Sequence, residues 1–406
     1  MYIKRHVEKV IDKSKNSYSA VLVTGPRQVG KSTVLKNLYP NINYQTLDNP
    51  LSLQAIKSDP VGYLKLQRVP FIIDEIQRVP ELFLSLKYMI DTNKSNGMYF
   101  LTGSQKFELM KGVSESLAGR VAIVNMLGLS TREIYHDDFN FPFIPTLEYL
   151  TSRNSKISTD ELKLWQRIHR GSMPKLYDDK DMDWEQYYSN YINTYLERDI
   201  NQLEQVGNTL QFLQFMTVLA SRTGELLNMN SIAKDIGVSA PTIKKWISVL
   251  QKSNIIYLLQ PFSLNINKRI VKTPKVYFTD TGLVAYLCRW LTPETLQNGA
   301  MSGAIYETYV VDEIIKSYFN VGKQPNIYYF RDTNGTEVDV LIYQNGILYP
   351  VEIKKTSSPN MKDIKHFKTL EKYFPSVKIG EGGVICNHDS LLPLGPNNKI
   401  IPVSMI

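Results

Sequence analysis

The chain has 406 residues, more than one hydrophobic core usually supports, so we expect about two to four domains. Hydrophobic residues make up 43% of the sequence and charged residues 21%, which is ordinary for a globular protein and excludes a fibrous or disordered chain. The two cysteines, Cys288 and Cys386, lie far apart and form no CxxC pair. A thiolate zinc site or a disulfide framework is therefore not expected, and a reducing compartment fits.

The N-terminal segment Met1–His6 lacks the apolar core of a signal peptide and leads directly into an amphipathic helical pattern. No part of the chain has the run of about 18 apolar residues that a membrane-spanning helix needs. We therefore expect a cytoplasmic protein without a membrane partner.

Positive charge is concentrated in one part of the chain. The net charge is +8, and residues 203–300 contain ten Lys or Arg against five Asp or Glu. Such an excess favours an anionic partner such as DNA. A solvated face without a ligand explains the charge equally well.

The first 150 residues alternate short apolar strands with helical segments, which indicates an α/β domain with a parallel sheet. The expected strands are residues 20–24, 44–47, 70–73, 98–102 and 121–126.

The residues that follow the first expected strand match GxxxxGK[ST], the phosphate-binding loop, and a helical segment at 33–38 comes next. Backbone N–H groups of such a loop surround phosphate oxygens, and the helix N-terminus adds a favourable dipole. We expect Lys31, exposed on an empty loop, to reach the β- and γ-phosphates of ATP, and Ser32 to ligate Mg²⁺. The expected ATP-binding residues are Gly25, Pro26, Arg27, Gln28, Val29, Gly30, Lys31, Ser32 and Thr33.

An acidic pair, Asp74 and Glu75, ends the apolar run Phe71-Ile72-Ile73. Asp74 is expected to hold the Mg²⁺ shell, and Glu75 to orient or deprotonate the attacking water. Two carboxylates can also follow a strand without any catalytic role. Beside a phosphate-binding loop, the catalytic interpretation is favoured.

Two further residues are candidates for contact with the γ-phosphate. Ser104 follows the next strand in the run 101–105, Leu-Thr-Gly-Ser-Gln, which is also a normal turn sequence. Arg120 could supply transition-state charge, in its own or a neighbouring subunit, or form an interdomain salt bridge. The sequence leaves these alternatives open.

Residues 155–220 are expected to be helical, and residues 221–285 to form a helix–turn–helix followed by strands. Ser231 is expected to cap a helix at 232–236. A turn at 237–239 then leads into a second helix at 240–251.

The second helix would bury an apolar stripe and expose lysines, as the recognition helix of a winged-helix module does. The stripe consists of Ile243, Trp246, Ile247 and Leu250. A strand at 255–259 and a basic segment at 265–272 resemble the wing. A module of this kind contacts DNA in some proteins and serves packing or protein contacts in others. The candidate DNA-contacting residues are Lys244, Lys245, Lys268 and Arg269.

From about residue 300 the pattern is a helix, three strands, a helix and another strand. The expected strands are residues 327–331, 338–343, 348–353 and 383–386.

Four charged residues in this last region are arranged as in PD-(D/E)XK nucleases. Asp339 and Glu352 lie on neighbouring strands and would bind Mg²⁺. Lys354, two positions after Glu352 on the same face, would stabilise or deprotonate the attacking water, and Glu307 would assist from the helix. Without a cation, repulsion should raise the pKa of the carboxylate pair. The alternative is a degenerate nuclease fold that is kept for binding.

These stretches together resemble a large family of prokaryotic AAA+-type ATPases with a poorly characterised C-terminal region, and the resemblance covers almost the whole chain. Its motifs are GPRQVGKST at 25–33, IDEIQRVP at 73–80, LTGSQ at 101–105, SLAGR at 116–120, YLERDI at 195–200, KTPKVYFTDTGL at 272–283, YYFRDTNGTEVDV at 328–340 and YPVEIKK at 349–355. Two departures are Gly171-Ser172-Met173-Pro174, where the family often has Gly-Gly-aromatic-Pro, and Gly128, where proline is common. The resemblance implies an ATPase and a nuclease-like C-terminal fold.

We therefore expect a multidomain α/β protein with ATP and Mg²⁺ as cofactors and an oligomeric state that the sequence leaves open. The expected domains are a P-loop ATPase domain at 1–150, a helical lid or linker at 151–220, a winged-helix-like domain at 221–295 and a restriction-endonuclease-like domain at 296–406.

Two functions compete on the sequence alone. The first is an ATP-driven, DNA-associated enzyme whose C-terminal domain cuts or grips nucleic acid. The second is a nucleotide-switched module that uses an inactive nuclease-like fold to bind a protein partner.

Overall fold

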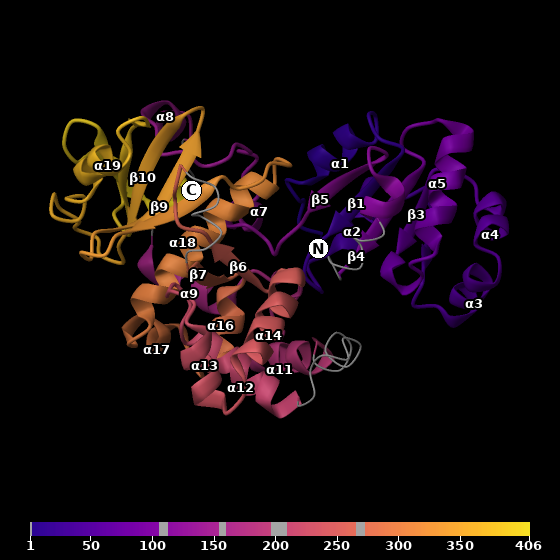
Figure 1. Ribbon diagram of the computed structural model, residues 1–406, viewed down its shortest axis with the longest axis horizontal. Helices are drawn as coiled ribbons and strands as arrows, with labels where there is room; N and C mark the ends of the chain where they lie inside the picture. Colours follow the sequence, from indigo (N-terminus) through magenta and orange to yellow (C-terminus); the bar gives the residue numbers. More distant parts are fainter. Residues whose placement is uncertain (1, 105–112, 154–159, 196–208, 265–272) are drawn as a thin grey trace.

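The computed structural model describes residues 2–104, 113–153, 160–195, 209–264 and 273–406. Three lobes are visible in Figure 1. An N-terminal α/β lobe lies at one end, a lobe built around a second sheet lies at the other, and a mainly helical lobe joins them.

The N-terminal lobe contains a five-stranded sheet in the order β2-β3-β4-β1-β5, with all paired strands parallel. Its strands are β1 (Ala20–Thr24), β2 (Asn43–Thr46), β3 (Phe71–Asp74), β4 (Tyr99–Gly103) and β5 (Val121–Asn125). Its helices are α1 (Glu8–Ser14), α2 (Lys31–Leu38), α3 (Pro50–Ser58), α4 (Pro60–Leu66) and α5 (Leu82–Asn93). The sequence predicted all five strands and the parallel sheet, with ends that differ by one residue at several strands.

Both faces of this sheet are covered, because alternate residues of a strand point to opposite sides. On β1, Val21 and Val23 pack in the same buried cluster as Val34 of α2. Their neighbours on the strand pack in a second cluster that contains residues of α3, α4 and α5. The strands β1, β3 and β4 are therefore buried along their whole length, as expected for a parallel sheet between two helical layers, while the edge strand β2 is polar and partly exposed.

After β5 the chain crosses from the N-terminal lobe to the C-terminal lobe, where the short helices α7 (Thr131–Ile134) and α8 (Leu147–Arg153) lie. The Arg132 guanidinium donates to the carbonyl of Ile406 at 2.9 Å, and the backbone N–H of Leu147 donates to Glu381 at 2.9 Å. The last strand of the N-terminal sheet, β5, ends at Asn125, and α7 and the start of α8 follow it within the range 1–150 predicted for the ATPase domain.

The middle lobe follows, and its helices and strands are α9 (Glu161–Arg170), α10 (Lys175–Asp178), α11 (Trp184–Tyr195), α12 (Thr209–Ala220), α13 (Met229–Ile236), α14 (Ala240–Lys252), β6 (Ile256–Leu259), β7 (Lys275–Phe278), α16 (Thr281–Leu287) and α17 (Pro293–Asn298). Strands β6 and β7 pair antiparallel.

The helix–turn–helix is present, but its first cap differs from the prediction. Helix α13 begins at Met229, and Asn228 rather than Ser231 caps it by accepting from the backbone N–H of Ser231 at 3.0 Å. Asn228 is the N-cap because it directly precedes the helix, and from there its side chain reaches the backbone N–H of the third helical residue. The predicted apolar stripe of α14 is buried, and Lys244 and Lys245 are exposed.

The C-terminal lobe starts with the long helix α18 (Ser302–Phe319) and continues with a mixed sheet, in the order predicted of a helix, three strands, a helix and another strand. Strands β8, β9 and β10 pair antiparallel, and β12 pairs parallel with β10. The elements are β8 (Ile327–Arg331), β9 (Glu337–Gln344), β10 (Ile347–Ile353), α19 (Phe367–Tyr373), β11 (Lys378–Ile379), β12 (Gly382–Cys386), β13 (Leu392–Pro393) and β14 (Asn398–Pro402).

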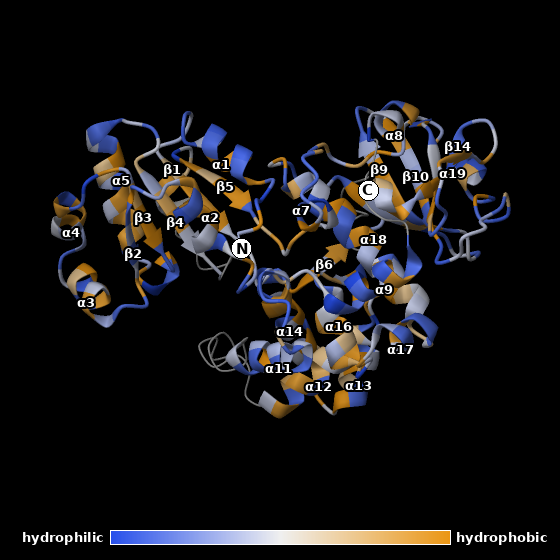
Figure 2. Cartoon of the chain, turned by 180° about the vertical axis from the view of Figure 1, so that it is seen from behind, coloured by the Kyte–Doolittle hydropathy of each residue, from blue (hydrophilic) through white to orange (hydrophobic). Residues whose placement is uncertain are grey.

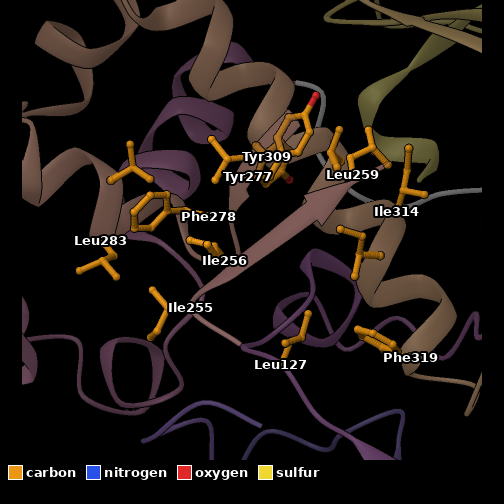
Figure 3. Packing of buried hydrophobic residues seen from close by; sticks show 14 of the residues in the cluster. Leu127, Ile255, Ile256, Leu259, Tyr277, Phe278, Leu283, Tyr309, Ile314 and Phe319 are labelled. Carbon is orange, nitrogen blue, oxygen red and sulfur yellow. The ribbon is translucent and has the colours of Figure 1, made fainter. Parts of the chain in front are cut away.

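One hydrophobic core runs through all three lobes. Figure 2 shows that strands β3, β5 and β6 are largely hydrophobic. In Figure 3, Leu127 from the segment after β5 lies near Phe319 of α18, and Ile255 of the middle lobe lies on its other side in the same buried cluster. The lobes are therefore joined by packing as well as by the chain.

Candidate functional site

The phosphate-binding loop lies between β1 and α2, at the carboxyl ends of the parallel strands. Gly25 is required there, because a Cβ at this position would collide with the carbonyl oxygen of Met126. The Lys31 side chain is buried rather than exposed, and this corrects the prediction. Its ammonium donates to the carbonyls of Gly25 and Pro26, at 3.1 and 2.7 Å, because the loop folds back over it.

Asp74 lies beside Ser32, and their role as two oxygen ligands of one magnesium ion stays a prediction. The Ser32 hydroxyl donates to Asp74 Oδ1 at 2.6 Å, and Thr102 donates to the same oxygen. Asp74 ends β3, Thr102 lies on the neighbouring β4, and Ser32 opens α2, so three elements meet at this carboxylate.

Glu75 and Ser104 are brought together by Gln77, a residue that sequence reasoning missed. Glu75 has a left-handed backbone, with φ of 58°, which turns the chain out of β3. The Gln77 side-chain amide donates to the Glu75 carboxylate and lies 3.5 Å from the Ser104 hydroxyl. The motif around 73–80 contained this glutamine, but nothing local indicated its contact.

A cavity of about 390 Å³ adjoins the loop. Its lining residues come from the N-terminal segment, the loop, α2 and α10, and include Ile3, Val29, Val34, Pro174 and Lys175. The cavity therefore has walls from both the N-terminal and the middle lobes, and no motif in the sequence had indicated it.

Arg120 does not lie beside the phosphate-binding loop of its own chain. It precedes β5, so it is at the opposite end of the sheet from the loop. Its guanidinium makes a bidentate ion pair with Asp91 of α5, at 2.6 and 3.1 Å. The predicted interdomain salt bridge is therefore wrong, because the partner belongs to the same lobe. A role in a neighbouring subunit is still a hypothesis.

Arg5, for which the sequence predicted no role, hydrogen-bonds to the phosphate-binding loop and to the segment after β5. Its buried guanidinium donates to the carbonyl of Val29 at 2.8 Å and to Glu133 of α7 at 3.0 Å. Its other N–H groups reach the carbonyls of Leu127 and Gly128. Burial of an arginine is tolerated here because a carboxylate and three carbonyls satisfy it.

The two departures from the family pattern contact each other. A Cβ at Gly128 would collide with the Ser172 side chain. Ser172 in turn donates to Asp280, from its backbone N–H at 2.7 Å and from its hydroxyl at 2.8 Å. Tyr188 also donates to Asp280, at 2.7 Å. Gly128 therefore provides the room that the Ser172 side chain occupies.

A second polar group, which we call the C-terminal ionic cluster, forms where β7, α18, β9 and β10 meet. It consists of Lys275, Tyr277, Glu307, Glu337, Asp339, Glu352 and Lys354. Lys354 Nζ lies 2.7 Å from Glu352 and 4.0 Å from Asp339, so three of the four predicted residues are in contact. Asp339 also accepts from the backbone N–H of Ile353 at 2.8 Å.

Glu307 is the fourth of the predicted nuclease-like residues, and its carboxylate forms an ion pair with Lys275. Lys275 Nζ lies 3.2 Å from Glu307 and 2.7 Å from Glu337, and its side chain is only 5% exposed. Tyr277 donates to Glu307 at 2.5 Å. Lys275 lies in one of the family motifs, but the sequence predicted no role for it. Its partners are more than 30 positions away in the sequence.

Two carboxylates of the cluster, Glu352 and Glu307, have a raised pKa. Burial raises the pKa of Glu352 to about 8, with a further contribution from Asp339. Burial and Asp339 also raise the pKa of Glu307 to about 7, against the opposing effect of Lys275. Of the pair for which the sequence predicted a pKa raised by repulsion, Glu352 has a raised pKa, and burial is a larger cause than the charge of Asp339. For Lys275, burial lowers the pKa, and the surrounding carboxylates more than reverse this effect.

In the part of the chain that the structure describes, no group of three or more His, Cys, Asp or Glu side chains is placed to hold a metal ion. Each of the two predicted magnesium sites has two predicted protein ligands. They are Ser32 and Asp74 at the first site, and Asp339 and Glu352 at the second.

Of the four candidate DNA-contacting residues, Lys244 and Lys245 are exposed on α14. Lys268 and Arg269 lie outside the described residues. Among the described helices, none is both long enough and apolar enough to cross a membrane.

Three family models match successive parts of the chain. Residues 17–135 match an AAA domain. Residues 161–294 and 302–406 match two domains of unknown function, DUF8612 and DUF4143. Uncharacterized proteins of Mycobacterium bovis and Mycobacterium tuberculosis are each 27% identical over 390 residues, which is 95% of this chain and 80% of theirs.

Among solved structures, the Walker-type ATPase PABY2304 of Pyrococcus abyssi is 14% identical, with a TM-score of 0.44 over 70% of this chain and 96% of its own. The RuvB Holliday junction branch migration motor of Thermotoga maritima is 15% identical, with a TM-score of 0.28 over 62% of this chain and 86% of its own. The match of residues 17–135 agrees with the loop, the sheet and the Ser32–Asp74 pair described above. The chain carries an AAA-type, P-loop ATPase domain in its N-terminal lobe.

Proposed function

We propose that the protein binds and hydrolyses Mg·ATP in its N-terminal lobe and uses the nucleotide to control the C-terminal ionic cluster. The observation that carries the first part is the contact of 2.6 Å between Ser32 and Asp74 at the end of the phosphate-binding loop. A hydroxyl and a carboxylate are hard oxygen donors, which is the donor chemistry that Mg²⁺ prefers, with the remaining ligands from phosphates and water.

The roles of the surrounding residues follow from their positions. Lys31 would leave the loop carbonyls and pair with the β- and γ-phosphates. Ser32 and Asp74 would hold Mg²⁺, which supplies positive charge to the phosphates. Glu75 would orient or deprotonate water, and Ser104, linked through Gln77, would contact the γ-phosphate.

The cavity beside the loop supports a nucleoside as the rest of the ligand. Its volume of about 390 Å³ and its apolar side chains suit a stacked purine with its ribose. Because Pro174 and Lys175 form part of its wall, a bound nucleotide would touch the middle lobe as well as the ATPase lobe. This contact is the first step by which nucleotide state could reach the rest of the molecule.

Strand β7 supports the second step. At its start, Lys275 makes ion pairs within the C-terminal ionic cluster. Just beyond its end, Asp280 accepts two hydrogen bonds from Ser172, whose carbonyl accepts from Leu129 of the segment after β5. A strand is a stiff element, so a shift of the Ser172 loop would be carried to Lys275.

For the cluster itself we propose metal-dependent action on DNA. Asp339 and Glu352 are two carboxylates that share one site with Lys354. One or two carboxylates together with substrate phosphates are a common way to hold Mg²⁺, which would activate water and neutralise the phosphate. Lys354 would pair with the scissile phosphate or the water, and Lys244 and Lys245 would contact the DNA backbone.

A cleavage assay tests this part. Duplex and single-stranded DNA are incubated with Mg²⁺ or Mn²⁺, with and without ATP, and with wild type, Asp339→Asn and Asp74→Asn. We expect wild type to cleave with a rate that ATP changes, and Asp74→Asn to cleave with a rate that ATP does not change. Asp339→Asn should not cleave, while it keeps its ATP hydrolysis. Cleavage by Asp339→Asn at the wild-type rate would contradict the assignment of the metal site.

A second function is favoured by one observation, the buried ammonium of Lys275 between Glu307 and Glu337. A lysine already neutralises these carboxylates, as in a cluster kept for structure or partner binding. The protein would then be a nucleotide-switched interaction module. A lack of cleavage of every DNA form, with normal ATP hydrolysis, would favour this function over the first.

A further inference from the structure

The Asp74 carboxylate has a different partner on each of its two oxygens. Oδ1 accepts from Ser32 and Thr102, which belong to the nucleotide site. Oδ2 accepts from the Tyr44 hydroxyl at 2.6 Å. Asp74 is only 7% exposed, so these hydrogen bonds fix the rotation of its side chain.

Tyr44 reaches Asp74 from the edge strand β2. In the parallel register of β2 and β3, Thr46 lies beside Asp74, and Tyr44 lies two residues earlier on the same face. The long tyrosine side chain spans that offset. The contact therefore joins an edge strand, which carries none of the predicted nucleotide ligands, to the magnesium ligand.

The ring of Tyr44 is itself held by α2. Lys36 Nζ lies 3.6 Å from the centre of the ring, a cation–π contact. Lys36 is one helical turn after Ser32, so both side chains project from the same face of α2. Ser32 then contacts Oδ1 of Asp74 while Lys36 holds the residue that contacts Oδ2. The two contacts form a closed clamp around the carboxylate.

We propose that Tyr44 is a positioning residue for Asp74, and that its hydroxyl sets the affinity of the nucleotide site for magnesium. The inference rests on the proposed Mg·ATP function and assigns to it a residue outside the loop and strand motifs. The hydroxyl holds Oδ2, so Oδ1 stays directed at Ser32. Without the Tyr44 hydroxyl, the Asp74 side chain would rotate among several positions, and Mg²⁺ would bind a less ordered ligand.

The test compares Tyr44→Phe with the matched control Tyr99→Phe in the full chain. Tyr44→Phe removes one hydroxyl and keeps the ring under Lys36. Tyr99 lies in the same sheet, on β4, and among the described residues its buried hydroxyl has no hydrogen-bond partner. Both variants therefore lose the same atoms, but only one loses a contact with Asp74.

Two binding constants are measured for each protein with a fluorescent ATP analogue, one in EDTA and one as Mg²⁺ is titrated in. Outer partners of metal ligands typically change metal affinity by about 10- to 100-fold. For Tyr44→Phe we expect the Mg²⁺ concentration at half-saturation to rise by at least roughly 10-fold. The affinity for the analogue in EDTA should be unchanged. Tyr99→Phe should match wild type in both. Melting temperatures check that both variants fold.

Three outcomes would overturn the inference. A Tyr44→Phe protein that titrates with Mg²⁺ like wild type shows that the hydroxyl does not position Asp74. An equal loss of affinity with and without Mg²⁺ shows that Tyr44 serves packing of β2 alone. If wild type binds the analogue equally well with and without Mg²⁺, the proposed Mg·ATP function itself fails, and this result is distinct from the other two.

Discussion

Replacement of Lys275 by methionine tests how strongly the middle and C-terminal lobes are joined. The side chain is 5% exposed and lies 3.2 Å from Glu307 and 2.7 Å from Glu337. Methionine keeps most of its volume and removes the charge. Removal of one partner from a buried ion pair typically costs about 3–5 kcal/mol, because the other charge is left without compensation.

The cost of Lys275→Met should depend on pH. Glu307 has a pKa of about 7 beside Lys275, and loss of the ammonium raises this pKa further. Above pH 7 the folded variant then binds a proton that the unfolded chain lacks, so its stability falls as pH rises. The loss grows by up to about 1.4 kcal/mol per pH unit. At pH 6 Glu307 is largely protonated in both proteins, and the cost is smaller.

Thermal unfolding at pH 6 and pH 8, followed by circular dichroism, measures this effect. For Lys275→Met we expect the melting temperature at pH 8 to fall by on the order of 10 °C, and by clearly less at pH 6. Lys355→Met is the control, because Lys355 donates to the carbonyl of Gln297 and the hydroxyl of Ser302. Its cost should not change between the two pH values. A loss for Lys275→Met that is under 2 °C, or equal at both pH values, would refute the reasoning.

Three other substitutions address single groups. Lys31→Ala should weaken ATP binding by roughly 10- to 100-fold, because a charged hydrogen-bond donor to the phosphates is lost, and equilibrium binding checks this. Glu352→Gln should flatten the decline in stability between pH 5 and pH 9, since the raised pKa of Glu352 makes the wild type lose stability as pH rises to about 8; parallel melting curves for both proteins would count against it. Replacing Lys244 and Lys245 together by alanine should make DNA binding less salt-dependent, by up to about 2 in the slope of log K against log salt.

The arrangement of residues around the phosphate-binding loop was predictable from the sequence, because its parts are local or meet for a general reason. The loop at 25–32 is one continuous motif, and Ser32 and Asp74 meet because carboxyl ends of parallel strands share one edge of the sheet. The contact of Glu352 with Lys354 was predictable in the same way, from the alternation of side chains along a strand.

What the sequence did not predict depends on side chains that meet across lobes. Arg5 reaches Glu133 across 128 positions, and Lys275 reaches Glu307 across 32. No periodicity or motif links such residues, since the contact exists only once the lobes have packed. Arg120 was uncertain for a different reason, since its partner Asp91 lies in the same lobe but could be identified only after α5 was placed beside the start of β5.

The central claim is that this chain hydrolyses Mg·ATP with Glu75 as the carboxylate that acts on water. The most direct measurement is a single-turnover hydrolysis assay on wild type and Glu75→Gln, with ATP binding measured on the same samples. Asp74 and Ser32 are untouched by this change, so binding of Mg·ATP should persist. The rate should fall by roughly 10²- to 10⁴-fold, as expected for loss of a general base. Hydrolysis by Glu75→Gln at the wild-type rate, or no hydrolysis by a wild type that binds Mg·ATP, would contradict the account.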